Sequence, residues 1–142
     1  MFELEPYKHP SHPEKRARKL SLEELCEKQP EERTLPYFSI SPEQLDRNIG
    51  FQGLNGTDQG DFLRLLPILW KANGLLQNFS KAIAKQLGFT EEGWERKRKV
   101  FIDKLLLEES PDGVYLLNRG FRQQYLNTLE TANSRRHYKK DK

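Results

Sequence analysis

Lysine and arginine are concentrated in three short runs, and these runs are the clearest chemical signal in the chain. EKRARK occupies residues 14–19, ERKRK residues 95–99 and SRRHYKKDK residues 134–142. Runs of basic side chains neutralise phosphate, so they favour an anionic partner such as DNA or RNA. An acidic stretch, EELCEKQPEE at 23–32, separates the first two runs, and the formal net charge is only +3. The whole surface is therefore not uniformly suited to nucleic acid.

No set of residues predicts catalysis or a metal site. The two neighbouring histidines, His9 and His12, have no Asp, Glu or Cys spaced to complete a set of metal ligands. Cys26 is the single cysteine, which excludes an internal disulfide, and we interpret it as an inert thiol. The glycine-rich stretch at 50–60 lacks the Gly-Lys-Ser/Thr ending of a phosphate-binding loop. We predict that the chain is not an enzyme, needs no cofactor or metal and has no small-molecule substrate.

The composition indicates a small core with much of the chain facing solvent. Hydrophobic residues make up 35% of the chain and charged residues 32%. No apolar run reaches the roughly 18 residues that a membrane helix needs, so we predict no membrane contact. A single cysteine is typical of a reducing compartment. The predicted location is therefore the cytoplasm, or the nucleus if the source is eukaryotic.

Composition divides the chain into four regions. We predict a polar, proline-rich arm at 1–36, a connector at 37–60, a compact domain at 61–131 and a basic tail at 132–142. One short helix is expected in the arm near residues 20–28, where Leu22 and Leu25 would be the docking residues. Such a helix is too short to be stable alone in water, so it needs a partner surface in this chain or in another.

The spacing of apolar residues in the compact region predicts three helices followed by a hairpin and a fourth helix. An apolar run from Phe62 to Trp70 indicates a buried first helix. The second helix is expected to end at Gly88 and the third to be capped by Thr90. Each predicted helix has one apolar face, formed by Leu76, Phe79, Ile83 and Leu87 in the second, by Trp94, Phe101 and Leu105 in the third, and by Phe121, Tyr125 and Leu129 in the last.

The hairpin is expected around the sequence Ser-Pro-Asp-Gly at 110–113, which has a type I turn pattern. Residues 105–107 before this turn and 114–117 after it are predicted to pair as two short strands. Asn118 would then cap the last helix. A cluster of four helices without pairing at 105–117 is the alternative.

Residues 79–122 resemble a winged helix-turn-helix. AIAKQLGFT at 82–90 looks like the second helix and turn of that motif, and DGVYLLNRG at 112–120 looks like the return strand of its wing and the start of the following helix. The resemblance implies a mainly α fold over about residues 61–131. This fold has a winged-helix-like three-helix core, a short β-hairpin and a C-terminal helix.

The resemblance places residues 90–107 where DNA-binding members of the superfamily have their recognition helix. Glu91 and Glu92 begin that helix and would repel phosphate. The predicted wing is also acidic, with Glu108, Glu109 and Asp112. Because winged helices also serve as protein-docking modules, the fold alone leaves both uses open.

We predict a non-catalytic nucleic-acid-binding protein, in which a small DNA-binding regulator is one form and DNA and RNA remain alternatives. The expected contacts are basic residues of the third helix and the tail, namely Arg96, Lys97, Lys99, Lys104, Arg135, Arg136, Lys139 and Lys140. The alternative is a structural or adaptor subunit of a larger assembly such as a virion, a transposition complex or a ribonucleoprotein. In that role the domain and the arm would contact protein partners.

Overall fold

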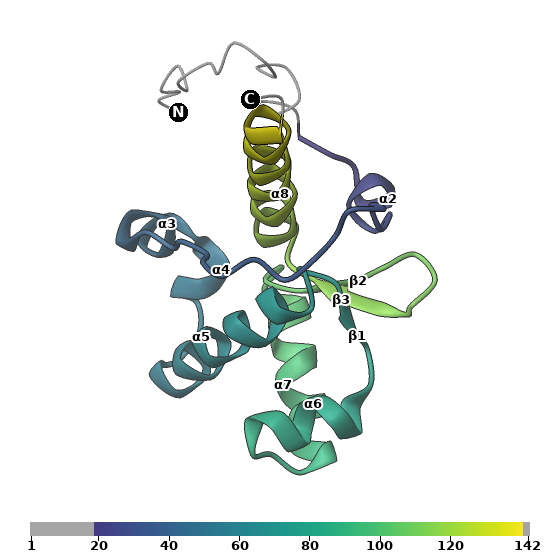
Figure 1. Cartoon of the computed structure of the whole chain (residues 1–142). Helices are drawn as coiled ribbons and strands as arrows, with labels where there is room; N and C mark the ends of the chain where they lie inside the picture. The colour runs from purple at the N-terminus through teal and green to yellow at the C-terminus, as the bar shows by residue number, and fades with distance from the viewer. Residues whose placement is uncertain (1–18, 141–142) are drawn as a thin grey trace.

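The computed structural model describes residues 19–140, and the side chains of residues 19–135 within them. This part of the chain is mainly helical, as predicted, and contains one small three-stranded antiparallel sheet in place of the predicted two-stranded hairpin (Figure 1). The first elements are α2 (Leu22–Leu25), α3 (Pro42–Arg47) and α4 (Ile49–Gln52). The remaining elements are α5 (Gly56–Lys71), β1 (Leu76–Gln77), α6 (Ser80–Leu87), α7 (Glu91–Asp103), β2 (Glu108–Glu109), β3 (Tyr115–Leu117) and α8 (Arg119–Lys140).

The sheet has the strand order β1-β3-β2, and both pairings are antiparallel. In the central strand, Leu116 pairs with Leu76 of β1, and Leu117 pairs with Glu108 of β2. Successive residues of a strand point to opposite faces, and both leucines are fully buried. Leu116 belongs to the main core, whereas Leu117 packs with Leu25 of α2 in a second, smaller cluster. The arm therefore covers the face of the sheet that the main core leaves open.

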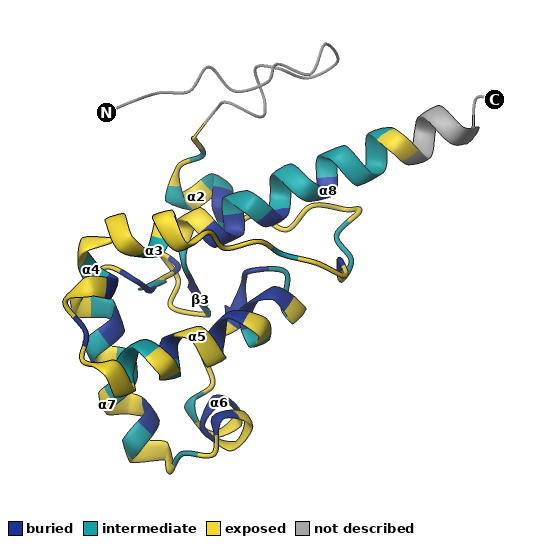
Figure 2. Ribbon diagram, turned by 90° about the vertical axis from the view of Figure 1, so that its left-hand side faces the viewer, coloured by how far each residue is buried: buried dark blue, intermediate teal, exposed yellow. Residues whose placement is uncertain are grey.

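The main core lies between α5, α6, α7 and the first half of α8 (Figure 2). Trp70 and Trp94 are almost completely buried there, which confirms their prediction as core residues. Phe62 of α5 meets Phe101 of α7 edge to face, with 5.4 Å between ring centroids. Pro67 lies inside α5, which continues through it from Gly56 to Lys71. These contacts fix the position of α7 against α5.

Two expectations about the second and third helices are wrong. Leu76 lies in β1, because its backbone pairs with Leu116, and α6 begins only at Ser80. Phe79 precedes that helix as its N-cap residue and is 57% exposed. Leu105 lies beyond the end of α7, has a φ of 60° and is 90% exposed. The first strand of the hairpin consequently starts at Glu108, later than the predicted 105–107.

The connector is more regular than its glycine content suggested. Asn48 and Asn55 each accept a hydrogen bond from a backbone N–H of the helix that follows, and so cap α4 and α5. As a result α5 begins at Gly56, ahead of residue 61. Gly50 is required by packing, since a Cβ there would lie 2.1 Å from the carbonyl oxygen of Lys104.

The last helix carries its buried side chains as predicted. Asn118 caps it by accepting from the N–H of Phe121 at 3.0 Å, and Phe121, Tyr125 and Leu129 are buried. The helix continues to Lys140, well beyond residue 131, and projects away from the sheet (Figures 1 and 2).

The arm runs alongside α8 and is held there by Arg122, whose side chain is completely buried. Its guanidinium group donates to the backbone oxygens of Leu25 at 2.7 Å, Glu27 at 2.9 Å and Asn73 at 2.8 Å. It also donates to both carboxylate oxygens of Glu32, at 3.0 and 2.7 Å. All five N–H donors of the group are used in this way. The arm was expected to need a partner surface, and in this structure α8 of the same chain provides it.

Candidate nucleic-acid interface

The candidate interface is built on α6 and α7, which pack against each other. Gly88 ends α6 in the left-handed conformation with a φ of 77°, and Phe89 N–H then donates to the carbonyl of Ala84 at 2.8 Å. Thr90 caps α7 by accepting from Gly93 N–H at 3.0 Å. Both ends of the turn are therefore set by local sequence, as predicted, and this turn fixes the angle at which α7 leaves α6.

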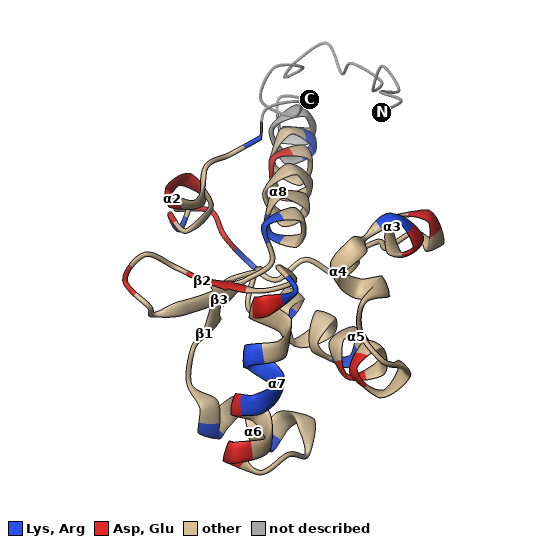
Figure 3. Ribbon diagram, turned by 180° about the vertical axis from the view of Figure 1, so that it is seen from behind, with Lys and Arg blue, Asp and Glu red and all other residues tan. Residues whose placement is uncertain are grey.

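The buried and exposed faces of α7 are clearly separated. Trp94 and Phe101, seven residues apart, face the core. The opposite face carries exposed charged residues, namely Glu92, Glu95, Arg96, Lys99 and Asp103. Figure 3 shows positive and negative segments along α7. Glu92 lies four residues before Arg96, and Glu95 lies four residues before Lys99. At this spacing an acid and a base are neighbours on the helix surface, so part of the positive potential of the bases is cancelled. Of the predicted contact residues, Arg96 and Lys99 are therefore presented to solvent.

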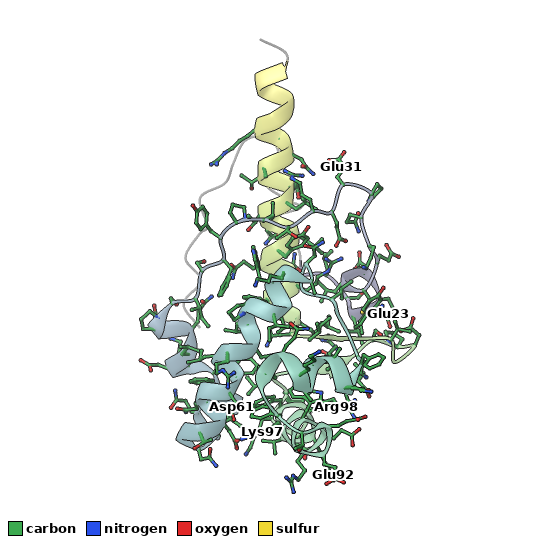
Figure 4. All side chains as sticks on the ribbon, turned by 60° about the horizontal axis from the view of Figure 1, so that its bottom comes forward. Glu23, Glu31, Asp61, Glu92, Lys97 and Arg98 are labelled. Atoms are coloured by element: carbon green, nitrogen blue, oxygen red, sulfur yellow. The ribbon has the colours of Figure 1, made fainter. Side chains whose placement is uncertain are left out.

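Lys97, also predicted as a contact residue, is partly buried and paired with carboxylates of the same chain. Its ammonium group bonds to the carboxylate of Asp58 and lies 2.9 Å from Oδ2 of Asp61, both on α5 (Figure 4). The three side chains are only 23%, 15% and 13% exposed. The hydrogen bonds from Asp58 and Asp61 raise the pKa of Lys97 above its ordinary value. In this structure Lys97 ties α7 to α5 and is not presented to a ligand.

Arg98 is similarly committed within the chain. Its Nη1 donates to Oδ1 of Asn78 at 2.8 Å, and the amide of Asn78 donates to Glu109 in β2 at 2.7 Å. This series of bonds connects α7 to the edge of the sheet. The middle of α7 is thus fixed on one side by Lys97 and on the other by Arg98.

Three further bases are exposed on or next to these helices. Lys104, predicted on the third helix, is exposed but follows the end of α7 as its C-cap residue. Lys81 and Lys85 lie on α6, and sequence reasoning missed them. Their i, i+4 spacing, on a helix whose apolar positions are Ile83 and Leu87, was the signal that could have identified them.

Acidic groups are exposed at the start of α7 and on the hairpin, where the sequence predicts them. Glu91 and Glu92 are exposed at the start of α7. In the hairpin turn, the hydrogen bond from the Ser110 hydroxyl lowers the pKa of Asp112, which keeps this exposed group ionised. Glu108 is paired with Arg119, whose Nη2 lies 2.9 Å from Oε2 of the carboxylate. The hairpin therefore has a negative tip, which extends on the α2 side of the sheet (Figure 1).

The remaining predicted site residues lie away from α6 and α7. Arg135 is exposed on α8, while the side chains of Arg136, Lys139 and Lys140 lie outside the part whose side chains are described. Leu25 is 1% exposed and packs with Leu75 and Leu117, and Leu22 packs against the same cluster. In this structure both docking leucines are thus engaged by their own chain.

Residues 19–140 contain no group of three His, Cys, Asp or Glu side chains placed to hold a metal ion. Within the same range, no helix has the length and apolar character needed to cross a membrane. His9 and His12 lie outside the described residues. The chain matches no protein-family model, and no curated protein or solved structure is significantly similar to it.

Proposed function

We propose that α5 to α8 form a winged helix and that its α6–α7 surface binds nucleic acid without catalysis. In this proposal α6 and α7 are the helix-turn-helix and the β2–β3 hairpin is the wing. The order of the elements supports it, with one strand between α5 and α6 and two strands after α7. The sheet order β1-β3-β2 supports it as well, because β1 pairs with the return strand of the wing.

The observation that carries the binding proposal is the exposure of bases on both helices. Lys81 and Lys85 on α6, Arg96 and Lys99 on α7 and the adjoining Lys104 all face solvent. Point charges of this kind contact phosphate and add affinity without reading bases. The acids at the start of α7 and in the wing repel phosphate, so we expect modest affinity with little sequence preference.

The direct test is fluorescence anisotropy with generic duplex DNA and with single-stranded RNA, each at about 50 and about 200 mM salt. If the five bases each neutralise one phosphate, duplex affinity falls about 500-fold between the two salt concentrations. The variant Arg96→Ser/Lys99→Ser should reduce the slope of log affinity against log salt by about 2.

The matched control is Lys28→Ser/Arg47→Ser, which removes the same charge from the arm and α3. We expect it to leave binding unchanged. An equal loss in both variants would mean attraction by net charge alone.

Bases of the basic tail are proposed to add affinity that is independent of sequence. Changing Arg135, Arg136, Lys139 and Lys140 to Ala should weaken binding to all sequences alike and flatten the salt dependence. Anisotropy with two unrelated duplexes measures both effects. Unchanged binding would remove the tail from the interface.

The second candidate function is a structural or adaptor subunit. It is favoured by the exposed Glu91 and Glu92 and by the acidic wing tip at Asp112, which suit a protein surface better than a phosphate backbone. Absence of binding at about 50 mM salt to either nucleic acid would favour this function over the first.

A further inference from the structure

The arm and α8 line an open groove of about 580 Å³. Both elements lie away from α6 and α7 (Figures 1 and 4). The floor of this groove is apolar and consists mainly of Leu20, Leu126 and Leu129. Its volume is within the range of sites that bind ligands or the anchor side chains of a peptide. Leu126 and Leu129 come from α8 and Leu20 from the arm, so the groove exists only because the arm packs on the helix.

The rim of the groove is acidic. Glu24, Glu27, Glu31 and Glu130 line it, and no lysine or arginine does so among the described residues. Glu27 and Glu31 are exposed at the rim, and Figure 4 shows Glu31 beside α8. Carboxylates around a concave apolar surface concentrate a negative potential there. The groove therefore combines a surface for an apolar side chain with a surface for cations.

The two sides of the groove, the arm and α8, are held together by hydrogen bonds within the chain. Leu20 N–H donates to Oε1 of Gln123 on α8 at 3.0 Å. Farther along the arm, Arg122 holds the carbonyl of Glu27, and the Tyr125 hydroxyl donates to the carbonyl of Arg33 at 2.6 Å. The arm is thus bonded to α8 at both ends of the groove. A partner would not have to order the arm, which lowers the entropic cost of binding.

We propose that this groove docks a segment of a partner protein that carries lysine or arginine side chains around one apolar side chain. The apolar side chain fills the leucine floor, and the cations meet Glu27 and Glu31 at the rim. Charge complementarity favours a basic protein segment over a nucleic acid, because the same carboxylates would repel phosphates. The inference is independent of nucleic-acid binding by α6 and α7, because it uses other residues.

The test uses the full chain and a short fluorescein-labelled peptide that alternates lysine and leucine. We expect the peptide to bind, and the same peptide with glutamate in place of lysine not to bind. Glu27→Gln/Glu31→Gln should weaken binding about tenfold, because two rim ion pairs are lost. The control is Glu91→Gln/Glu92→Gln, which makes the same change in net charge on α7 and should leave the affinity unchanged. Both pairs of residues are exposed, so thermal unfolding should show that both variants remain folded.

Three results would overturn the proposal. An equal loss of affinity in the two variants would mean attraction by net charge. No binding of the lysine–leucine peptide by the native chain, with binding only after Lys15, Arg16 and Arg18 are changed to Ser, would show that the groove takes the chain's own basic run in place of a partner protein. A dimer in sedimentation that Glu27→Gln/Glu31→Gln dissociates would identify a second copy of the chain as the occupant.

Discussion

Basic side chains occur in this protein in two different surroundings, one buried and one exposed to solvent. Around Arg122, a completely buried guanidinium meets Glu32 and three backbone carbonyls, and each of its donors has an acceptor. On the outward face of α7, Arg96 and Lys99 are exposed and point away from the core. The first group holds the arm on α8, and the second is free to meet a partner from solution.

The difference shows that charge in the sequence does not by itself indicate function. Lys97 is flanked by Arg96 and Arg98 and resembles its neighbours in sequence, yet its ammonium group is engaged by two carboxylates of α5. Burial and the number of partners distinguish the residues that hold the fold from those that are available to a ligand. This distinction leads to measurable differences in stability and in binding.

The largest effect is expected from removing the buried guanidinium. Arg122→Met removes the buried guanidinium that donates to the Glu32 carboxylate and to three carbonyls, which should cost about 3–5 kcal/mol of unfolding free energy. Urea denaturation measures this loss. Arg119→Met is the matched control, because it removes an exposed partner of Glu108 and should cost less than about 1 kcal/mol. Equal losses in the two variants would show that the buried group does not hold the arm.

A smaller loss is expected from Lys97→Met. Asp58 and Asp61 would then stay close together on α5, mostly buried and without their common counter-charge. We expect a loss of about 1–2 kcal/mol in urea denaturation. Adding Asp58→Asn should restore part of this stability, because it removes the repulsion between the two carboxylates. No recovery in the double variant would contradict the assigned role of the pair.

The pH dependence of Glu32 gives a finer test. Burial opposes its charged form, but the hydrogen bonds from Arg122 and from Gln29 N–H outweigh burial and lower its pKa below the ordinary 4.5. A lowered pKa stabilises the fold fully above pH 4.5, and this contribution is lost as the pH falls through the pKa of the folded state. The stability difference between the native protein and Glu32→Gln should therefore shrink in acid. A difference that stays constant down to the acid transition would contradict this.

The parts of the fold that were predicted correctly depend on local sequence. Thr90 and Asn118 were identified as caps because the residue type and the next three residues decide such a bond. The strand at Leu76 was missed, since its two residues become a strand only by pairing with Leu116. In isolation the same residues fit the helical spacing just as well.

The ion pairs that distinguish structural from exposed bases could not be predicted either, because their partners are far apart in the sequence. Glu32 and Arg122 are 90 residues apart, and Lys97 and Asp58 are 39 apart. No periodicity links such distant positions, so the sequence predicts Lys97 as a contact residue together with Arg96 and Lys99. The exposed bases of α6 could have been found from their spacing, but the commitment of Lys97 could not.

The most direct test of the account compares two variants that each remove one positive charge from α7, Lys97→Met and Lys99→Met. Duplex DNA affinity is measured by anisotropy across salt concentrations, and stability by urea denaturation. We expect Lys99→Met to bind more weakly, with its salt slope reduced by about 1, and to keep its stability. Lys97→Met should keep its affinity and slope while losing stability. If Lys97→Met weakens DNA binding as much as Lys99→Met does, the proposed division between structural and ligand-binding charges is wrong.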